Sequence, residues 1–117
     1  MTETSQQPGA TLLDHHDPLE ATLAHIATIA RTKRRDYALD GHPYSNFHDT
    51  ATMLGLPGFT EVESACFNVL QKIARLRSLR ANGRLTDPTN ETVQDTYLDL
   101  ACYAVIAATL NTLRTAQ

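Results

Sequence analysis

Hydrophobic positions recur at helical spacing along most of the chain, and no segment alternates polar and apolar residues as a strand does. The longest such segment runs from Glu91 to Leu113, and residues 98–108 within it are apolar apart from Asp99 and Tyr103. A helix that is apolar on most sides is normally buried. We therefore expect this segment to be the central helix of the domain.

The first of the other helices begins at Asp17-Pro18-Leu19-Glu20. Asp17 is a good N-cap, Pro18 suits the first helical position, and Glu20 completes a pattern that resembles a capping box. A buried face is expected from the apolar residues that follow at helical spacing, which are Leu19, Leu23, Ile26 and Ile29 or Ala30. The helix ends in a basic cluster, Arg31 to Arg35, which is either a solvated C-terminus that complements the helix dipole or a rim that attracts phosphate.

Two more helices follow a turn at residues 40–45. Ser45 or Asn46 can cap a short helix that ends at Leu54, before Gly55, and this helix is expected to dock through Phe47 and Met53 or Leu54. Thr60-Glu61-Val62-Glu63 is a capping box that starts a helix running to about Arg80. The expected buried face of that helix consists of Val62, Cys66, Val69, Ile73 and Leu76, and a polar stripe consists of Asn68, Gln71, Lys72 and Arg75.

These elements predict an all-α fold, a compact bundle of about four helices, three long and one short. About ten residues join the last two helices, so they should pack as antiparallel neighbours. Residues 1–16 are rich in Thr and Gln and show little apolar periodicity, which predicts a flexible tail. Residues 17–117 then form a single domain.

Composition narrows the possible functions only slightly. The net charge of −3 gives no strong case for nucleic-acid binding, and no signal peptide or membrane-spanning run is evident. Cys66 and Cys102 both lie in apolar helical settings without metal-ligand spacing, and we expect free, buried thiols. A reduced, cytoplasmic location fits this expectation.

Two carboxylates on the last helix are the main candidates for chemistry. Asp95 and Asp99 are one helical turn apart, on a stripe that continues into apolar positions, and Glu91, one turn earlier, is a candidate to extend this row. Such acids are costly to bury unless a metal ion or a cation pairs with them. Acidic residues also favour the N-terminus of a helix, which explains Glu91 and leaves Asp95 open, but explains Asp99 poorly.

The polar stripe of the preceding helix can meet these acids. Lys72 and Arg75 are three residues apart, so both cations can point at one spot. In one alternative Lys72 or Arg75 pairs with Asp95 and Asp99 in a buried salt-bridge network that fixes the helix register. In the other alternative, the aspartates hold Mg²⁺. Substrate phosphates are then contacted by Lys72, Arg75 and the basic cluster Arg31 to Arg35.

Three segments, KRRDYALDGHPYSNF, QKIARLRSL and ETVQDTYLDLACYAVIA, resemble in this order a small phage and prophage family called nucleotide modification associated domain 1. The resemblance covers roughly residues 31–110. It rests on Lys33, Asp36-Tyr37, Asn46-Phe47, Lys72, Arg75-Leu76, Glu91, Asp95-Thr96, Asp99, Ala101 and Tyr103.

That family is similar to the all-α nucleoside triphosphate pyrophosphatases of the MazG type, which bind Mg²⁺ through acidic residues on two adjacent helices and cleave between the α and β phosphates. The resemblance implies Glu91, Asp95 and Asp99 as metal-binding and catalytic residues. It implies substrate contacts from Lys33, Asp36, Tyr37, Asn46, Lys72, Arg75 and Tyr103. In this chain Gln71 stands where the family pattern has an acid, and no ExxE pair precedes it.

Three functions therefore stay open. The first is a Mg²⁺-dependent nucleotide pyrophosphohydrolase, and the second is a catalytically silent protein that binds or sequesters a nucleotide or another phosphorylated small molecule. The third is a structural helical oligomer. Relatives of this fold bury helix faces between subunits and four short helices leave a small core, so a homo-oligomer, most simply a dimer, is expected.

Overall fold

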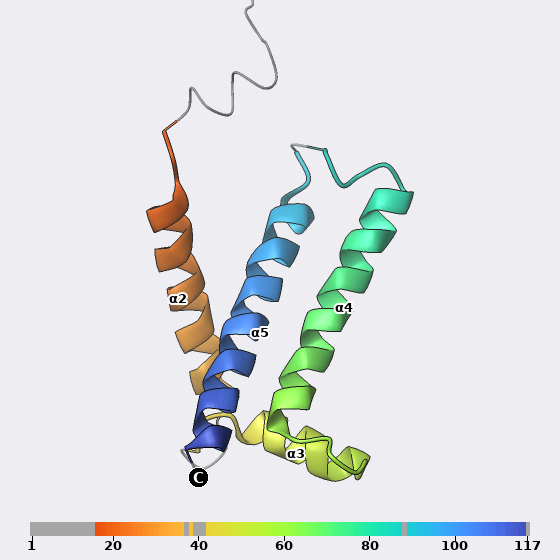
Figure 1. The fold of residues 1–117 in the computed structure, drawn as a ribbon. Helices are drawn as coiled ribbons and strands as arrows, with labels where there is room; N and C mark the ends of the chain where they lie inside the picture. Colours follow the sequence, from red (N-terminus) through yellow and green to blue (C-terminus); the bar gives the residue numbers. More distant parts are fainter. Residues whose placement is uncertain (1–15, 37, 39–41, 88, 117) are drawn as a thin grey trace, which may run out of the picture.

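The computed structural model describes residues 16–36, 38, 42–87 and 89–116, which form four α-helices without a strand (Figure 1). The helices are α2 (Leu19–Asp36), α3 (Ser45–Leu54), α4 (Glu61–Ala81) and α5 (Glu91–Thr115). The all-α prediction is confirmed, and the predicted boundaries of all four helices agree with the structure to within two residues at each end, including the end of α2 in its basic cluster. The predicted tail falls almost wholly outside the described residues.

Local side-chain chemistry sets the helix ends. Asp17 Oδ1 accepts a hydrogen bond from the Leu19 amide at 3.0 Å, and Asn90 Oδ1 accepts one from the Thr92 amide at 3.0 Å. Both bonds satisfy amides that lack a partner within their helix. Helix α3 ends where Gly55 takes a left-handed conformation with φ of 63°, and its amide donates to the Ala51 carbonyl.

Helix α5 lies between α2 and α4, and α3 crosses below the first turns of α4 (Figure 1). The chain thus forms an open arc: α5 packs on α4 and on α2, while α2 and α4 do not pack on each other. Helices α4 and α5 are antiparallel neighbours, as their short connection predicts. The central position of α5 is the reason that its sequence is apolar on most sides.

The core lies where α3, α4 and α5 meet. Phe47 from α3 and Ala65 from α4 have no exposed surface, and they pack with Val62, Tyr103, Ile106 and Leu110. Phe47 therefore docks α3, as predicted. Met53 and Leu54 do not dock it, because their side chains are 86% and 50% exposed.

Several positions predicted to be buried are at the surface instead. They are Leu19 and Leu23 on α2, Cys66 and Ile73 on α4, and Leu113 on α5. Helical spacing correctly places each of them on an apolar side of its helix. It does not reveal whether another helix covers that side, and in an open arc one side of each outer helix has no neighbour.

Helix α5 is also long and apolar enough, by length and composition, to be a candidate membrane span, which differs from the sequence expectation. One third of that span is buried within the described part of the chain. Core helices of globular domains meet the same criterion, so this observation has little weight by itself.

The capping box at the start of α4 predicts a specific response to pH. The Thr60 hydroxyl and amide donate to Glu63, and with Arg114 they lower the pKa of its carboxyl from 4.5 to about 2. A carboxyl with a lowered pKa stabilises the folded state fully above its unfolded pKa of 4.5, and this contribution is lost as pH falls towards 2.

We therefore expect the melting temperature to fall more steeply between about pH 5 and pH 2 for the unmodified chain than for Glu63→Gln, which cannot titrate. Differential scanning calorimetry across this range measures the difference. Glu20→Gln, at an exposed acid in the first turn of α2, is the matched control and should keep the slope of the unmodified chain. Equal slopes for Glu63→Gln and the unmodified chain would contradict the prediction.

Candidate functional site

Asp99 lies at the centre of the arc and pairs with one lysine from each outer helix. Its Oδ1 lies 3.6 Å from Lys33 Nζ of α2, and its Oδ2 lies 3.5 Å from Lys72 Nζ of α4. Because α2 and α4 do not pack on each other, these two ion pairs join the outer helices through a single carboxylate on α5.

The three charged groups are shielded from solvent but not sealed from it. The side chains of Lys33 and Lys72 are 19% and 21% exposed, and that of Asp99 is 31% exposed. Lys33 Nζ also lies 4.9 Å from the ring centroid of Tyr103, within the range of a cation–π contact. The cluster of Lys33, Lys72 and Asp99 carries a net charge of +1 and is partly exposed to solvent.

Cys102 lies beside this cluster, and its contacts are those of a buried core residue. Its thiol has no exposed surface and donates to the Ile26 carbonyl, with Sγ 3.6 Å from the oxygen. Burial raises the pKa of the Cys102 thiol, Lys33 opposes that rise, and Asp99 adds to it. A neutral, buried thiol is a poor nucleophile. The hydrogen bond of Cys102 instead joins α5 to α2. Both cysteines are free, but only Cys102 is buried as predicted.

The structure brings together only part of the predicted site. Lys33, Lys72, Asp99 and Tyr103 meet, whereas Glu91, Asp95, Arg75 and Asn46 are exposed. Among the described residues, neither Glu91 nor Asp95 takes part in an ion pair. Asp36 is exposed and pairs with its neighbour Arg35 at 3.5 Å, and Tyr37 lies outside the described residues.

These contacts do not suit a magnesium ion. In the part of the chain that the structure describes, no three His, Cys, Asp or Glu side chains gather closely enough to hold a metal ion. Both oxygens of Asp99 face ammonium groups, and a divalent cation at the same carboxylate would lie among two positive charges that repel it. Magnesium binding at Glu91, Asp95 and Asp99 remains a prediction, and the observed pairing of Asp99 does not favour it.

The sequence predicted Lys72 as a candidate partner of Asp99 but did not predict Lys33 in that role. Lys33 entered the prediction as part of the basic cluster at the end of α2 and as a substrate contact that the resemblance implies, but not as a partner of Asp99. The missing information was the position of α2, because no local pattern says which helix will bring a cation to a carboxylate 66 residues further along the chain.

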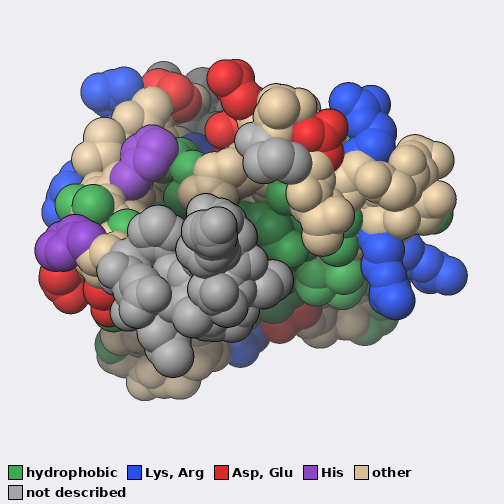
Figure 2. All heavy atoms as spheres, turned by 90° about the horizontal axis from the view of Figure 1, so that it is seen from above, with side chains coloured by type: hydrophobic (Ala, Val, Ile, Leu, Met, Phe, Trp, Pro, Cys, Tyr) green, Lys and Arg blue, Asp and Glu red, His purple; other side chains and the backbone are tan. Residues whose placement is uncertain are grey.

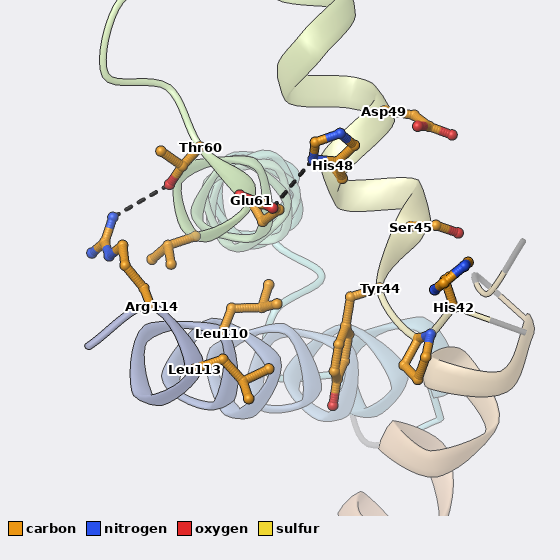
Figure 3. A pocket seen from close by; sticks show the side chains of 12 residues that line it. His42, Tyr44, Ser45, His48, Asp49, Thr60, Glu61, Leu110, Leu113 and Arg114 are labelled. Atoms are coloured by element: carbon orange, nitrogen blue, oxygen red, sulfur yellow. Dashed lines mark hydrogen bonds and ion pairs between the residues drawn. The ribbon is translucent and has the colours of Figure 1, made fainter. Parts of the chain in front are cut away.

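A cavity lies towards the other end of α5, where α3 meets the first turn of α4 (Figure 3). This cavity of about 700 Å³ has Tyr44, Leu110 and Leu113 on one side and polar residues on the other. His48 Nδ1 lies 3.3 Å from Glu61 Oε2, and Arg114 Nη1 donates to Thr60 Oγ1 at 3.3 Å. His42 and His48 are exposed.

No protein-family model, curated protein sequence or solved structure matches this chain.

Proposed function

We propose that this protein binds a phosphorylated small molecule, of the nucleotide class that the sequence resemblance implies, at Lys33, Lys72 and Asp99. The observation that carries the proposal is the convergence of two ammonium groups from separate helices on one carboxylate, at 3.6 Å and 3.5 Å. A structural ion pair needs one cation. Here two cations meet one carboxylate at a partly exposed point.

An anionic ligand gains from this arrangement in a definite way. A phosphate group carries up to two negative charges and several acceptor oxygens, and lysine is a common phosphate-binding side chain. Phosphate can therefore compete with Asp99 for Lys33 and Lys72. Arg34 and Arg35, in the last turn of α2, add positive charge on the approach from that helix.

The positions of the motif residues also support a single site. Lys33, Lys72 and the pair Asp99 and Tyr103 come from three separate segments of the resemblance to the nucleotide modification associated family, and they meet at one place. Packing alone does not require the three segments to present their polar residues to one another. Nothing in the binding that we propose depends on a metal ion.

A structural role is the second candidate, and one observation favours it. Both oxygens of Asp99 already have partners within the chain, so the cluster can join α2, α5 and α4 without any ligand. A pyrophosphohydrolase, the remaining hypothesis, needs the metal site that the contacts of Asp99 do not favour.

Binding of nucleoside mono- and triphosphates, measured by isothermal titration calorimetry with Mg²⁺ or with EDTA, tests the proposal. We expect binding in both conditions, weakened about tenfold or more in Lys72→Ala, because one charge-assisted contact is lost. Arg84→Ala, at an exposed cation in the loop after α4, is the control and should bind as the unmodified chain does. Complete absence of nucleotide binding would leave the structural role.

Asp99→Asn separates the proposal from metal-dependent chemistry in the same experiment. Asparagine keeps the size of the side chain and removes the charge that competes with phosphate, so we expect binding to tighten by several-fold. If Asp99 were a magnesium ligand, the same change would weaken binding, and the loss would appear only with Mg²⁺ present.

A further inference from the structure

The outer surface of α4 carries a row of residues that no other helix in the described part of the chain covers. Helix α4 forms one edge of the arc and packs on α5 along one side and on α3 near its start (Figure 1). On its free side Phe67, Leu70 and Ile73 are 50%, 60% and 48% exposed, and Cys66 is exposed beside them. Figure 2, seen from above, shows hydrophobic side chains at the surface next to a group of Lys and Arg side chains.

Three of these residues, Cys66, Leu70 and Ile73, have the spacing of a coiled-coil seam. Glu63, Cys66, Leu70, Ile73, Arg77 and Arg80 alternate steps of three and four residues, which keeps them in one line along the helix. The centre of the row is apolar and its ends are charged. We call this row the α4 stripe.

The charges at the two ends of the α4 stripe are opposite. Glu63 lies at the end near the start of α4, and Arg77 and Arg80 lie at the other end. Neither arginine pairs with an acid among the described residues. Glu63 Oε2 accepts a hydrogen bond from Arg114 at 3.3 Å, and a carboxylate has further lone pairs to accept a second cation.

We propose that the α4 stripe is the interface of a homodimer in which the two α4 helices cross antiparallel. A twofold axis between Leu70 and Ile73 sets Leu70 against Ile73 of the partner subunit and Glu63 against Arg80 of the partner subunit. The four apolar residues around the axis leave water together, and each end gains an ion pair. A parallel pair would instead bring Arg77 and Arg80 against the same arginines.

A lipid surface suits this stripe less well than a second copy does. Its apolar part extends only from Cys66 to Ile73, about two helical turns, and charged residues close it at both ends on the same line. An apolar centre within a charged rim is the composition of a protein interface. The dimer goes beyond the proposed ligand binding and does not depend on it.

Sedimentation equilibrium of the full chain tests the dimer. We expect twice the chain mass of 12.9 kDa for the unmodified protein and a monomer for Leu70→Glu, which puts two carboxylates at the axis. Met53→Glu introduces the same charge at an 86% exposed position on α3 and should stay dimeric. Far-ultraviolet circular dichroism establishes that each variant keeps its helical content.

A cross-link tests the orientation. In the antiparallel arrangement residue 77 faces Cys66 of the partner subunit, so Arg77→Cys should form a disulfide-linked dimer under mild oxidation, and Cys66→Ser in the same chain should abolish it. A monomeric unmodified protein, or a Leu70→Glu variant that remains dimeric, overturns the proposal. Binding of the monomer to phosphatidylglycerol vesicles, lost in Leu70→Glu, would overturn it in favour of a lipid surface.

Discussion

Phe47→Ala is expected to lower the free energy of unfolding by about 3–5 kcal/mol, which is the usual cost of removing a fully buried phenylalanine. Phe47 has no exposed surface and fills the centre of the cluster formed by α3, α4 and α5. Only small surrounding movements can refill its volume, because Val62 and Tyr103 are held by their own helices. Urea unfolding followed by circular dichroism measures the loss.

The matched control for this variant lies on the same helix. Met53 is 86% exposed, so Met53→Ala removes a large apolar side chain from α3 without leaving a cavity, and it should change stability by less than about 0.5 kcal/mol. Similar losses for the two variants would show that α3 does not dock through Phe47. All chains are compared at one protein concentration, because the dimer that we propose would contribute to the measured stability.

Ile106→Ala is expected to cost about 2–5 kcal/mol for a related reason. Ile106 is 2% exposed and lies on the side of α5 that packs against α4. Its neighbour Val105 lies about 100° further round the same helix and is 47% exposed, so Val105→Ala should have a small effect in the same urea titration. Equal effects at the two positions would mean that α5 presents a different side to the core.

Residues 105 and 106 show the limit of what the sequence pattern predicts about burial. Both are β-branched and apolar in a helix that is apolar almost all round, so local pattern gives no reason to separate them. The position of α4 separates them. The two cysteines make the same point, since each lies in an apolar helical segment and only Cys102 lies beneath a neighbouring helix, where its thiol reaches Ile26.

The candidate site shows the same division. Burial of Asp99 with a cation follows from its place in an apolar helix, because a carboxylate there needs a partner. Lys72 could be named in advance, since a short loop makes α4 and α5 neighbours and helical spacing places Lys72 on the correct side. Nothing in the sequence indicated Lys33 as a second partner of Asp99. The other candidate cation named from the sequence was Arg75.

The sequence by itself determined the helices and their ends. Asp17, the Thr60–Glu63 box and Asn90 act on amides within three residues, and such short-range contacts are the same in any tertiary arrangement. The tertiary structure alone decided that the helices form an open arc, that Lys33 and Lys72 share Asp99, and that the α4 stripe stays uncovered. Those outcomes depend on which sides of separate helices meet, and residue spacing along one helix carries no information about that.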